Sequence, residues 1–260
     1  MATWNRNTTV RPTTGAVQYD ASIDQGLRSY MLQVYNYMAI GLALTGVAAL
    51  GVFALATTQD AAGAAAQIGN GIYLTQFGVT LFTTPLKWVL ALAPLGIVFW
   101  LSFGVHKMDP AKARGLFFLY AALVGASLST IFLVYTSESI VRVFFITAVS
   151  FGGLSLYGYT TKKDLSGMGS FLIMGVIGIF IAMLVNIFLQ SSALQFAISI
   201  IGVLVFAGLT AYDTQRIKES YYVGDDGAVA GRKAVIGALQ LYLDFIMMFQ
   251  FLLSLLGNRN

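Results

Sequence analysis

The sequence predicts an all-α polytopic membrane protein with seven transmembrane helices. Of the 260 residues, 57% are hydrophobic and only 10% are charged, whereas soluble domains carry about 25% charged residues. A membrane helix takes about 20 residues, so the apolar residues are sufficient for roughly seven spans. This composition excludes a soluble enzyme core and a disordered chain.

Charges and turn residues divide the chain into these spans. Residues 29–59 are uncharged, which favours a first helix over residues 30–57. The weakly apolar stretch 61–78 is expected to form an external loop. The remaining spans are predicted at residues 86–105, 115–135, 140–160, 169–189, 194–212 and 234–256.

Spans five and six are expected to form a tight hairpin. No charge interrupts residues 165–212, a length of about two crossings, and the polar residues 190–195 are the only plausible turn within it. The predicted organisation is therefore a cytoplasmic segment (1–29), one seven-helix membrane domain (30–257) and a short tail (258–260). The polar first 28 residues do not resemble a signal peptide.

The basic residues predict the orientation. Twelve of the 15 Lys and Arg residues lie in the amino-terminal segment and in the loops after spans two, four and six. Because cytoplasmic loops of membrane proteins are enriched in basic residues, we expect a cytoplasmic amino terminus and an external carboxyl terminus. The same enrichment explains the net charge of +4 without a nucleic-acid partner.

The chain has few residues that support catalysis. It lacks cysteine, which removes disulfides, thiolate metal sites and cysteine nucleophiles. The only histidine, His106, cannot form a zinc or haem centre alone, and at the inner end of span two it is expected to anchor the interface. We therefore expect neither an enzyme nor an organic cofactor.

Ionisable residues inside membrane spans are the main functional candidates, because each costs several kcal/mol unless it is paired or hydrated. Asp244 lies about 15 Å inside the seventh predicted span. Gly237, Gln240 and Asp244 fall on one helical stripe, which indicates a face turned toward protein or water. A structural carboxylate held by hydrogen bonds from a neighbouring helix is the alternative.

Asp213, at the cytoplasmic end of the sixth span, is the second candidate. Alone it is typical of a solvated helix end paired with Arg216 or Lys218. However, a turn over residues 224–231 would place Asp213 and Asp244 nearly equidistant from its centre. Two antiparallel helices joined there would bring the two carboxyl groups to the same height.

Such a pair predicts proton and cation chemistry. Two carboxylates close together in a low-dielectric site cannot both ionise freely, so they would share a proton at moderate pH. Without the proton, Asp213 and Asp244 would offer oxygen ligands to a hard cation such as Ca²⁺, which takes six to eight oxygens. Asn186 in span five is either a further oxygen ligand or an interhelical hydrogen-bond partner.

Five segments resemble the bacterial branch of the Bax inhibitor-1 family, also called the transmembrane Bax inhibitor motif family. The last two segments are the most specific, and the similarity runs from about residue 26 to the end. The segments are GLRSYMLQVYNYMAIGLALTG (26–46), YGYTTKKDLSGMGSFLIMG (157–175), LVNIFLQSS (184–192), LTAYDTQRIK (209–218) and ALQLYLDFIMMFQFLLSLL (238–256).

The resemblance implies six helices around a central carboxyl-terminal helix, an inner-membrane location and a pH-sensitive Ca²⁺ leak. The family's paired aspartates correspond to Asp213 and Asp244, which would hold spans six and seven closed while they share a proton. Some members also have a basic residue in span two that supports this latch. Here only His106 and Lys107, at the end of that span, are available.

Two other functions are weighed against the leak. Paired aspartates on spans six and seven also resemble presenilin-type intramembrane proteases, but Asp244 lies in LYLD rather than GxGD and no proline follows it. Bacterial relatives are also associated with a membrane-bound ATP-dependent protease. This association implies a non-transporting scaffold that modulates the protease, with the aspartates as a structural latch.

Overall fold

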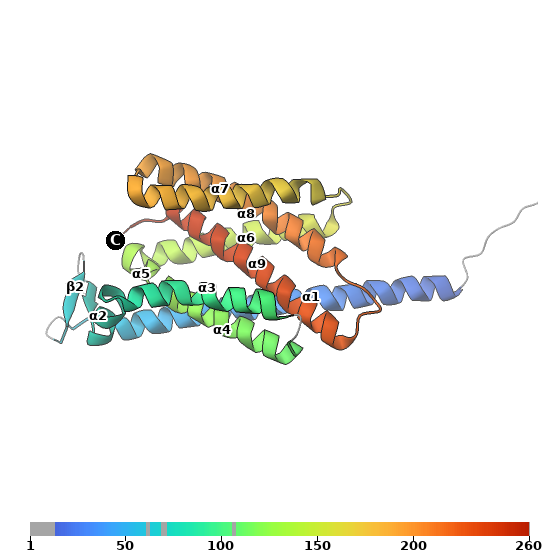
Figure 1. The fold of residues 1–260 in the computed structure, drawn as a ribbon, viewed down its shortest axis with the longest axis horizontal. Coiled ribbons are helices and arrows are strands. Elements are labelled where there is room, and N and C mark those ends of the chain that lie inside the picture. The colour runs from blue at the N-terminus through green and yellow to red at the C-terminus, as the bar shows by residue number, and fades with distance from the viewer. Residues whose placement is uncertain (1–13, 61–62, 69–71, 106–107, 260) are drawn as a thin grey trace, which may run out of the picture.

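A helix of 43 residues, α1 (Thr14–Ala56), begins the fold of the computed structural model, which describes residues 14–60, 63–68, 72–105 and 108–259 (Figure 1). α1 starts within the segment expected to precede the membrane domain, so the described part of that segment is helical. The other helices are α2 (Gln76–Thr83), α3 (Leu86–Gly104), α4 (Pro110–Leu128), α5 (Ile131–Val134), α6 (Ser137–Thr160), α7 (Ser166–Leu189), α8 (Ser192–Glu219) and α9 (Gly227–Leu256).

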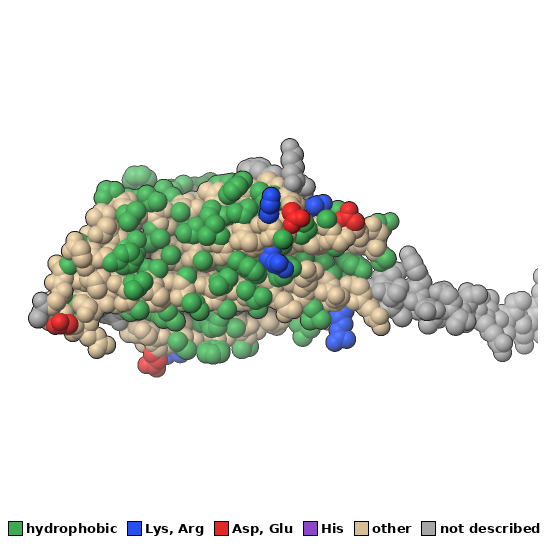
Figure 2. All heavy atoms as spheres, turned by 90° about the horizontal axis from the view of Figure 1, so that it is seen from below, with side chains coloured by type: hydrophobic (Ala, Val, Ile, Leu, Met, Phe, Trp, Pro, Cys, Tyr) green, Lys and Arg blue, Asp and Glu red, His purple; other side chains and the backbone are tan. Residues whose placement is uncertain are grey.

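The all-α membrane fold is confirmed. Within the described residues, six helical segments are long and apolar enough to cross a bilayer, and α4 with α5 count as one of them. A seventh crossing is formed if α2 and α3, which are bent by 73° relative to each other, act as one broken span. The large apolar side chains exposed along the bundle are the expected lipid-facing surface (Figure 2).

The stretch 61–78, which was expected to form an external loop, contains secondary structure that was not predicted. Strands β2 (Ala66–Ile68) and β3 (Ile72–Leu74) lie within it, and β1 (Thr57–Thr58) directly follows α1. The three strands pair antiparallel in the order β1-β3-β2. Short strands with few apolar residues carry little sequence signal, so only the pairing reveals them.

The carboxyl-terminal helix is the centre of the bundle. In its most apolar window 56% of the residues of α9 are buried, against 11% for α7. α9 packs against α1, α4, α6 and α8, whereas α3 packs on α4 and α7 packs on α8 (Figure 1). The expected central helix is therefore confirmed, and the helices around it form two groups, α1 with α3 and α4 on one side and α6 and α7 with α8 on the other.

Small residues bring neighbouring helices close together within each group. A Cβ added to Gly125 of α4 would overlap the carbonyl oxygen of Thr45 in α1. A Cβ added to Gly158 of α6 would overlap the carbonyl oxygen of Ala211 in α8. Close backbone approach through glycine is typical of membrane helix pairs.

Candidate functional site

The two helices that carry the candidate aspartates are positioned by polar caps. Gln190, in the left-handed conformation at φ 49°, ends α7, and the hydroxyl of Ser191 accepts a hydrogen bond from the Leu194 amide to start α8. This confirms the predicted hairpin. Asp226 caps α9 by accepting from the Val229 amide at 2.6 Å. Both caps satisfy amide groups that the first helical turn leaves free.

The loop between α8 and α9 lies earlier than predicted. It covers residues 220–226, and most of the expected turn, 227–231, belongs to the first turn of α9 because the Asp226 cap starts the helix there. The register across the two helices is nevertheless close to the prediction. Ser220 meets Lys233, and Ile217 lies against Gly237.

Asp213 and Asp244 meet across the interface between α8 and α9. Their carboxyl groups lie within hydrogen-bonding distance of each other. Asp213 is partly buried, and Asp244 is only 3% exposed. Among the described residues, no hydroxyl, amide or cationic donor reaches the buried Oδ2 atom of Asp244.

The basic residues near the pair have different roles. Arg216, one turn after Asp213, is exposed and interacts electrostatically with that carboxyl group. Lys218 instead donates a hydrogen bond to the carbonyl oxygen of Tyr159 at 2.8 Å and lies 5.3 Å from the centre of the Tyr159 ring. Of the two cations expected near Asp213, Arg216 is therefore the one that acts on its carboxyl group.

Neighbours of the two aspartates are anchored to different helices. Thr214, next to Asp213, lies 2.9 Å from the hydroxyl of Ser155 in α6. The hydroxyl of Tyr242, two residues before Asp244, lies 2.7 Å from that of Thr45 in α1. Sequence reasoning missed these anchors, because only their spatial neighbours distinguish them from ordinary hydroxyl residues of a membrane helix.

Gln240 and Arg216 line a small cavity beside the pair. The cavity has a volume of about 160 Å³ and lies at the loop between α8 and α9. We call it the proximal cavity. Its lining residues are Tyr30, Arg216, Ile217, Ser220, Lys233, Ile236, Gly237 and Gln240. The predicted polar stripe of α9 therefore runs from this cavity to Asp244.

Two other predicted residues are not at the pair. Asn186 lies in the last turn of α7, where it donates to Gln195 at 3.2 Å and accepts from the Ser191 amide at 3.0 Å. Gln195 precedes Asp213 by 18 residues of helix, about 27 Å. Asn186 is therefore a hydrogen-bond partner rather than a third oxygen at the pair, and His106 lies outside the described residues.

Metal ligands at the pair are limited to two carboxyl groups. In the part of the chain that the structure describes, no three His, Cys, Asp or Glu side chains are grouped closely enough to hold an ion. A Ca²⁺ ion there would take its remaining oxygen ligands from water and carbonyl groups.

Asp164, in the loop between α6 and α7, is an exposed carboxyl group with which the aspartate pair can be compared. The Ser166 backbone amide donates to it at 2.8 Å, and this hydrogen bond lowers the pKa of its exposed carboxyl group. Asp164 therefore stays ionised through the neutral range. A pH response near neutrality does not arise from this carboxyl group.

Comparison with known proteins assigns most of the chain to one family. Residues 27–260 match the family described as inhibitor of apoptosis-promoting Bax1. An uncharacterized protein of Caulobacter vibrioides is 47% identical over 92% of this chain and 92% of its own length. A protein of Rickettsia prowazekii is 46% identical (92% and 93%), and the inner membrane protein YbhL of Escherichia coli K12 is 45% identical (90% and 93%).

Proposed function

Because the chain belongs to the Bax inhibitor-1 family of membrane proteins, we propose that it is a pH-sensitive cation leak, with Ca²⁺ as the transported ion, gated by Asp213 and Asp244. The observation that carries this proposal is the contact between the two carboxyl groups inside the bundle. A carboxylate accepts hydrogen bonds and cannot donate them, so this contact is a hydrogen bond only when the pair holds a proton.

The shared proton acts as a latch between α8 and α9. The aspartates join two groups of helices, since Thr214 is tied to α6 and Tyr242 is tied to α1. When the proton leaves, two like charges face each other in a site from which water is largely excluded. At an effective dielectric constant of 20, two unit charges 4 Å apart repel by about 4 kcal/mol, and this repulsion favours separation of α8 and α9.

Location and orientation follow from the same proposal. YbhL is named an inner membrane protein, and this chain has several helices long and apolar enough to cross a bilayer, so we propose a location in the bacterial inner membrane. The excess of basic residues supports a cytoplasmic location for the amino terminus and the α8–α9 loop. The partners of the protein are then the lipid bilayer, protons and Ca²⁺.

Ca²⁺ flux into reconstituted liposomes tests the leak. We expect flux that rises steeply between about pH 6 and pH 8 as the proton is lost. Asp213→Asn and Asp244→Asn should each remove this pH response, because an amide can donate the hydrogen bond without a titratable proton. Asp164→Asn is the matched control and should behave like the wild type. Wild-type pH dependence in both site variants would reject the mechanism.

The same variants separate the alternatives. A presenilin-type protease would cleave a membrane substrate and lose this activity in both variants, whereas we propose no catalytic activity. A scaffold for a membrane-bound ATP-dependent protease would retain the protease in a pull-down after both substitutions. Binding that persists while wild-type liposomes show no flux would favour the scaffold over the leak.

A further inference from the structure

The polarity of the interface between α8 and α9 changes along its length. On α8, residues spaced by three and four positions follow one face, and on α9 a second set does the same. The α8 set is Gln195, Ser199, Gly202, Phe206, Leu209 and Asp213, and the α9 set is Gln240, Asp244, Met247, Phe251 and Ser254. Both sets are polar at their ends and apolar in the middle.

Hydrogen bonds join the polar ends far from the aspartates. The Ser199 hydroxyl donates to the Ser254 hydroxyl at 3.0 Å, and the Gln195 amide donates to Ser254 at 3.5 Å. Gln195 in turn accepts from Asn186 of α7. Three helices therefore converge on a polar cluster at the end of the bundle where α9 ends.

A cavity of about 420 Å³ opens beside this cluster. We call it the distal cavity, and it is lined by Met183, Asn186, Ile187, Gln195, Met247, Gln250, Phe251 and Ser254. Gln250 makes no hydrogen bond to another described residue, although an amide in an apolar environment without partners costs several kcal/mol. The volume holds on the order of ten water molecules at about 30 Å³ each.

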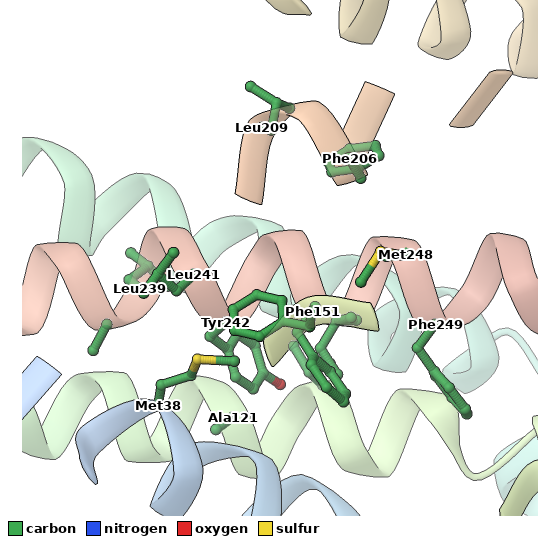
Figure 3. Packing of buried hydrophobic residues seen from close by; sticks show 14 of the residues in the cluster. Met38, Ala121, Phe151, Phe206, Leu209, Leu239, Leu241, Tyr242, Met248 and Phe249 are labelled. Atoms are coloured by element: carbon green, nitrogen blue, oxygen red, sulfur yellow. The ribbon is translucent and has the colours of Figure 1, made fainter. Parts of the chain in front are cut away.

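Phe206 and Phe251 close the interface between the distal cavity and the aspartates. Their ring centres are 5.9 Å apart, and each side chain is 6% exposed. A Cβ added to Gly202 would lie 2.5 Å from the Phe251 ring, so the ring fills the space that this glycine leaves. Figure 3 shows Phe206 and Leu209 on the α8 segment that runs beside α9.

We propose that the distal cavity is a water-filled vestibule for a hydrated cation and that Phe206 and Phe251 form an apolar constriction between it and the aspartate pair. The proposal rests on the leak function, because it describes the same path. Narrow apolar constrictions stop ions by excluding water. The path then has polar chambers at both ends, the proximal and the distal cavity, with the aspartates and the phenylalanine pair in series between them.

The natural absence of cysteine makes the vestibule directly testable. Gln250→Cys and Leu184→Cys would be placed in lipid nanodiscs, where both membrane faces are accessible, and treated with a charged, membrane-impermeant thiol reagent. Leu184 lies at about the same distance from the end of α7 as Gln250 does from the end of α9. Unlike Gln250, it is 59% exposed on the outside of the bundle, where it faces lipid. We expect Cys at position 250 to react at least about tenfold faster than Cys at position 184. Equally slow reaction would overturn the vestibule whether or not the protein conducts.

Phe251→Ala tests the constriction in the liposome flux assay. We expect flux at pH 8, where the aspartate latch is open, to rise about tenfold or more, because the apolar constriction is then the remaining barrier in the path. Phe249→Ala is the matched control, since Phe249 is also 6% exposed but packs beside Phe144 of α6 at 6.3 Å. This variant should conduct like the wild type, and size-exclusion profiles would confirm that both variants remain folded.

The outcomes distinguish the constriction from the proposed function. A wild-type leak that is unchanged by Phe251→Ala overturns the constriction and leaves the leak. A silent wild type with a conducting Phe251→Ala variant supports the constriction and removes the pH-gated leak. Equal increases in the Phe251→Ala and Phe249→Ala variants indicate general loosening of the bundle and also overturn the constriction.

Discussion

The proposed shared proton should make the stability of the protein depend on pH, and Asp244→Asn should remove that dependence. Under the proposal, the carboxyl pair of the folded protein retains one proton, whereas in the unfolded chain both carboxyl groups are ionised above about pH 5. Because the folded state then binds one more proton, stability falls as pH rises, by about 1.4 kcal/mol per pH unit while the proton remains bound.

This slope is large enough to measure. For chains of 150–250 residues, 1 kcal/mol shifts the unfolding midpoint by about 2–4 °C, so the wild type should lose roughly 3–6 °C per pH unit between about pH 5 and pH 7. Asp244→Asn should have a flatter profile, because its amide donates to Asp213 without an added proton. Thermal unfolding in detergent at one fixed scan rate would measure both profiles.

Control variants separate the contribution of the aspartate pair to the pH slope from that of other residues. The slope is compared between variants in which His106, the one histidine of the sequence, is unchanged. Asp164→Asn should keep the wild-type slope, because the lowered pKa of Asp164 confines its contribution to the acid range, where stability is lost as pH falls. Parallel profiles for the wild type and Asp244→Asn would refute the shared proton.

Two predictions concern the anchors and close contacts around the site. Tyr242→Phe should lower stability by about 1 kcal/mol, because it removes the hydrogen bond to Thr45, while Tyr120→Phe, whose hydroxyl makes no hydrogen bond to a described residue, should be nearly neutral. Gly158→Ala should cost about 1–3 kcal/mol, because the new Cβ meets a backbone oxygen. Gly153→Ala, which meets open space, should be tolerated. Thermal midpoints at one pH would check both pairs, and equal shifts within a pair would contradict the packing argument.

Much of the fold could be predicted because a long apolar stretch in a membrane has few stable structures other than a transmembrane helix. The ends of α7 and the position of the hairpin follow from Gln190 and the uncharged stretches on either side of it. The central position of α9 came from the family resemblance, and the burial of this helix confirms it. The small sheet was missed because its strands are short and its pairing partner follows a membrane helix.

Site residues could be predicted from the sequence only where burial of the side chain in a membrane is energetically unfavourable. Asp244 stands out because an unpaired acid inside a bilayer is unfavourable, and Asp213 followed from the expected register. The loop position was wrong because a glycine-rich stretch after Asp226 favours a turn, whereas the cap starts a helix there. Of the two roles left open for Asn186, the structure shows the interhelical hydrogen bond, to Gln195 of α8.

The two glycine contacts limit how such a protein can change shape. Gly125 fixes α4 to α1 and Gly158 fixes α6 to α8 at backbone contact, so neither pair can slide or separate without losing that fit. A conducting conformation would therefore preserve the Cα spacing within each of these pairs and alter it mainly between α8 and α9. Spin labels placed within and between the pairs would record rigid units that pivot rather than helices that bend.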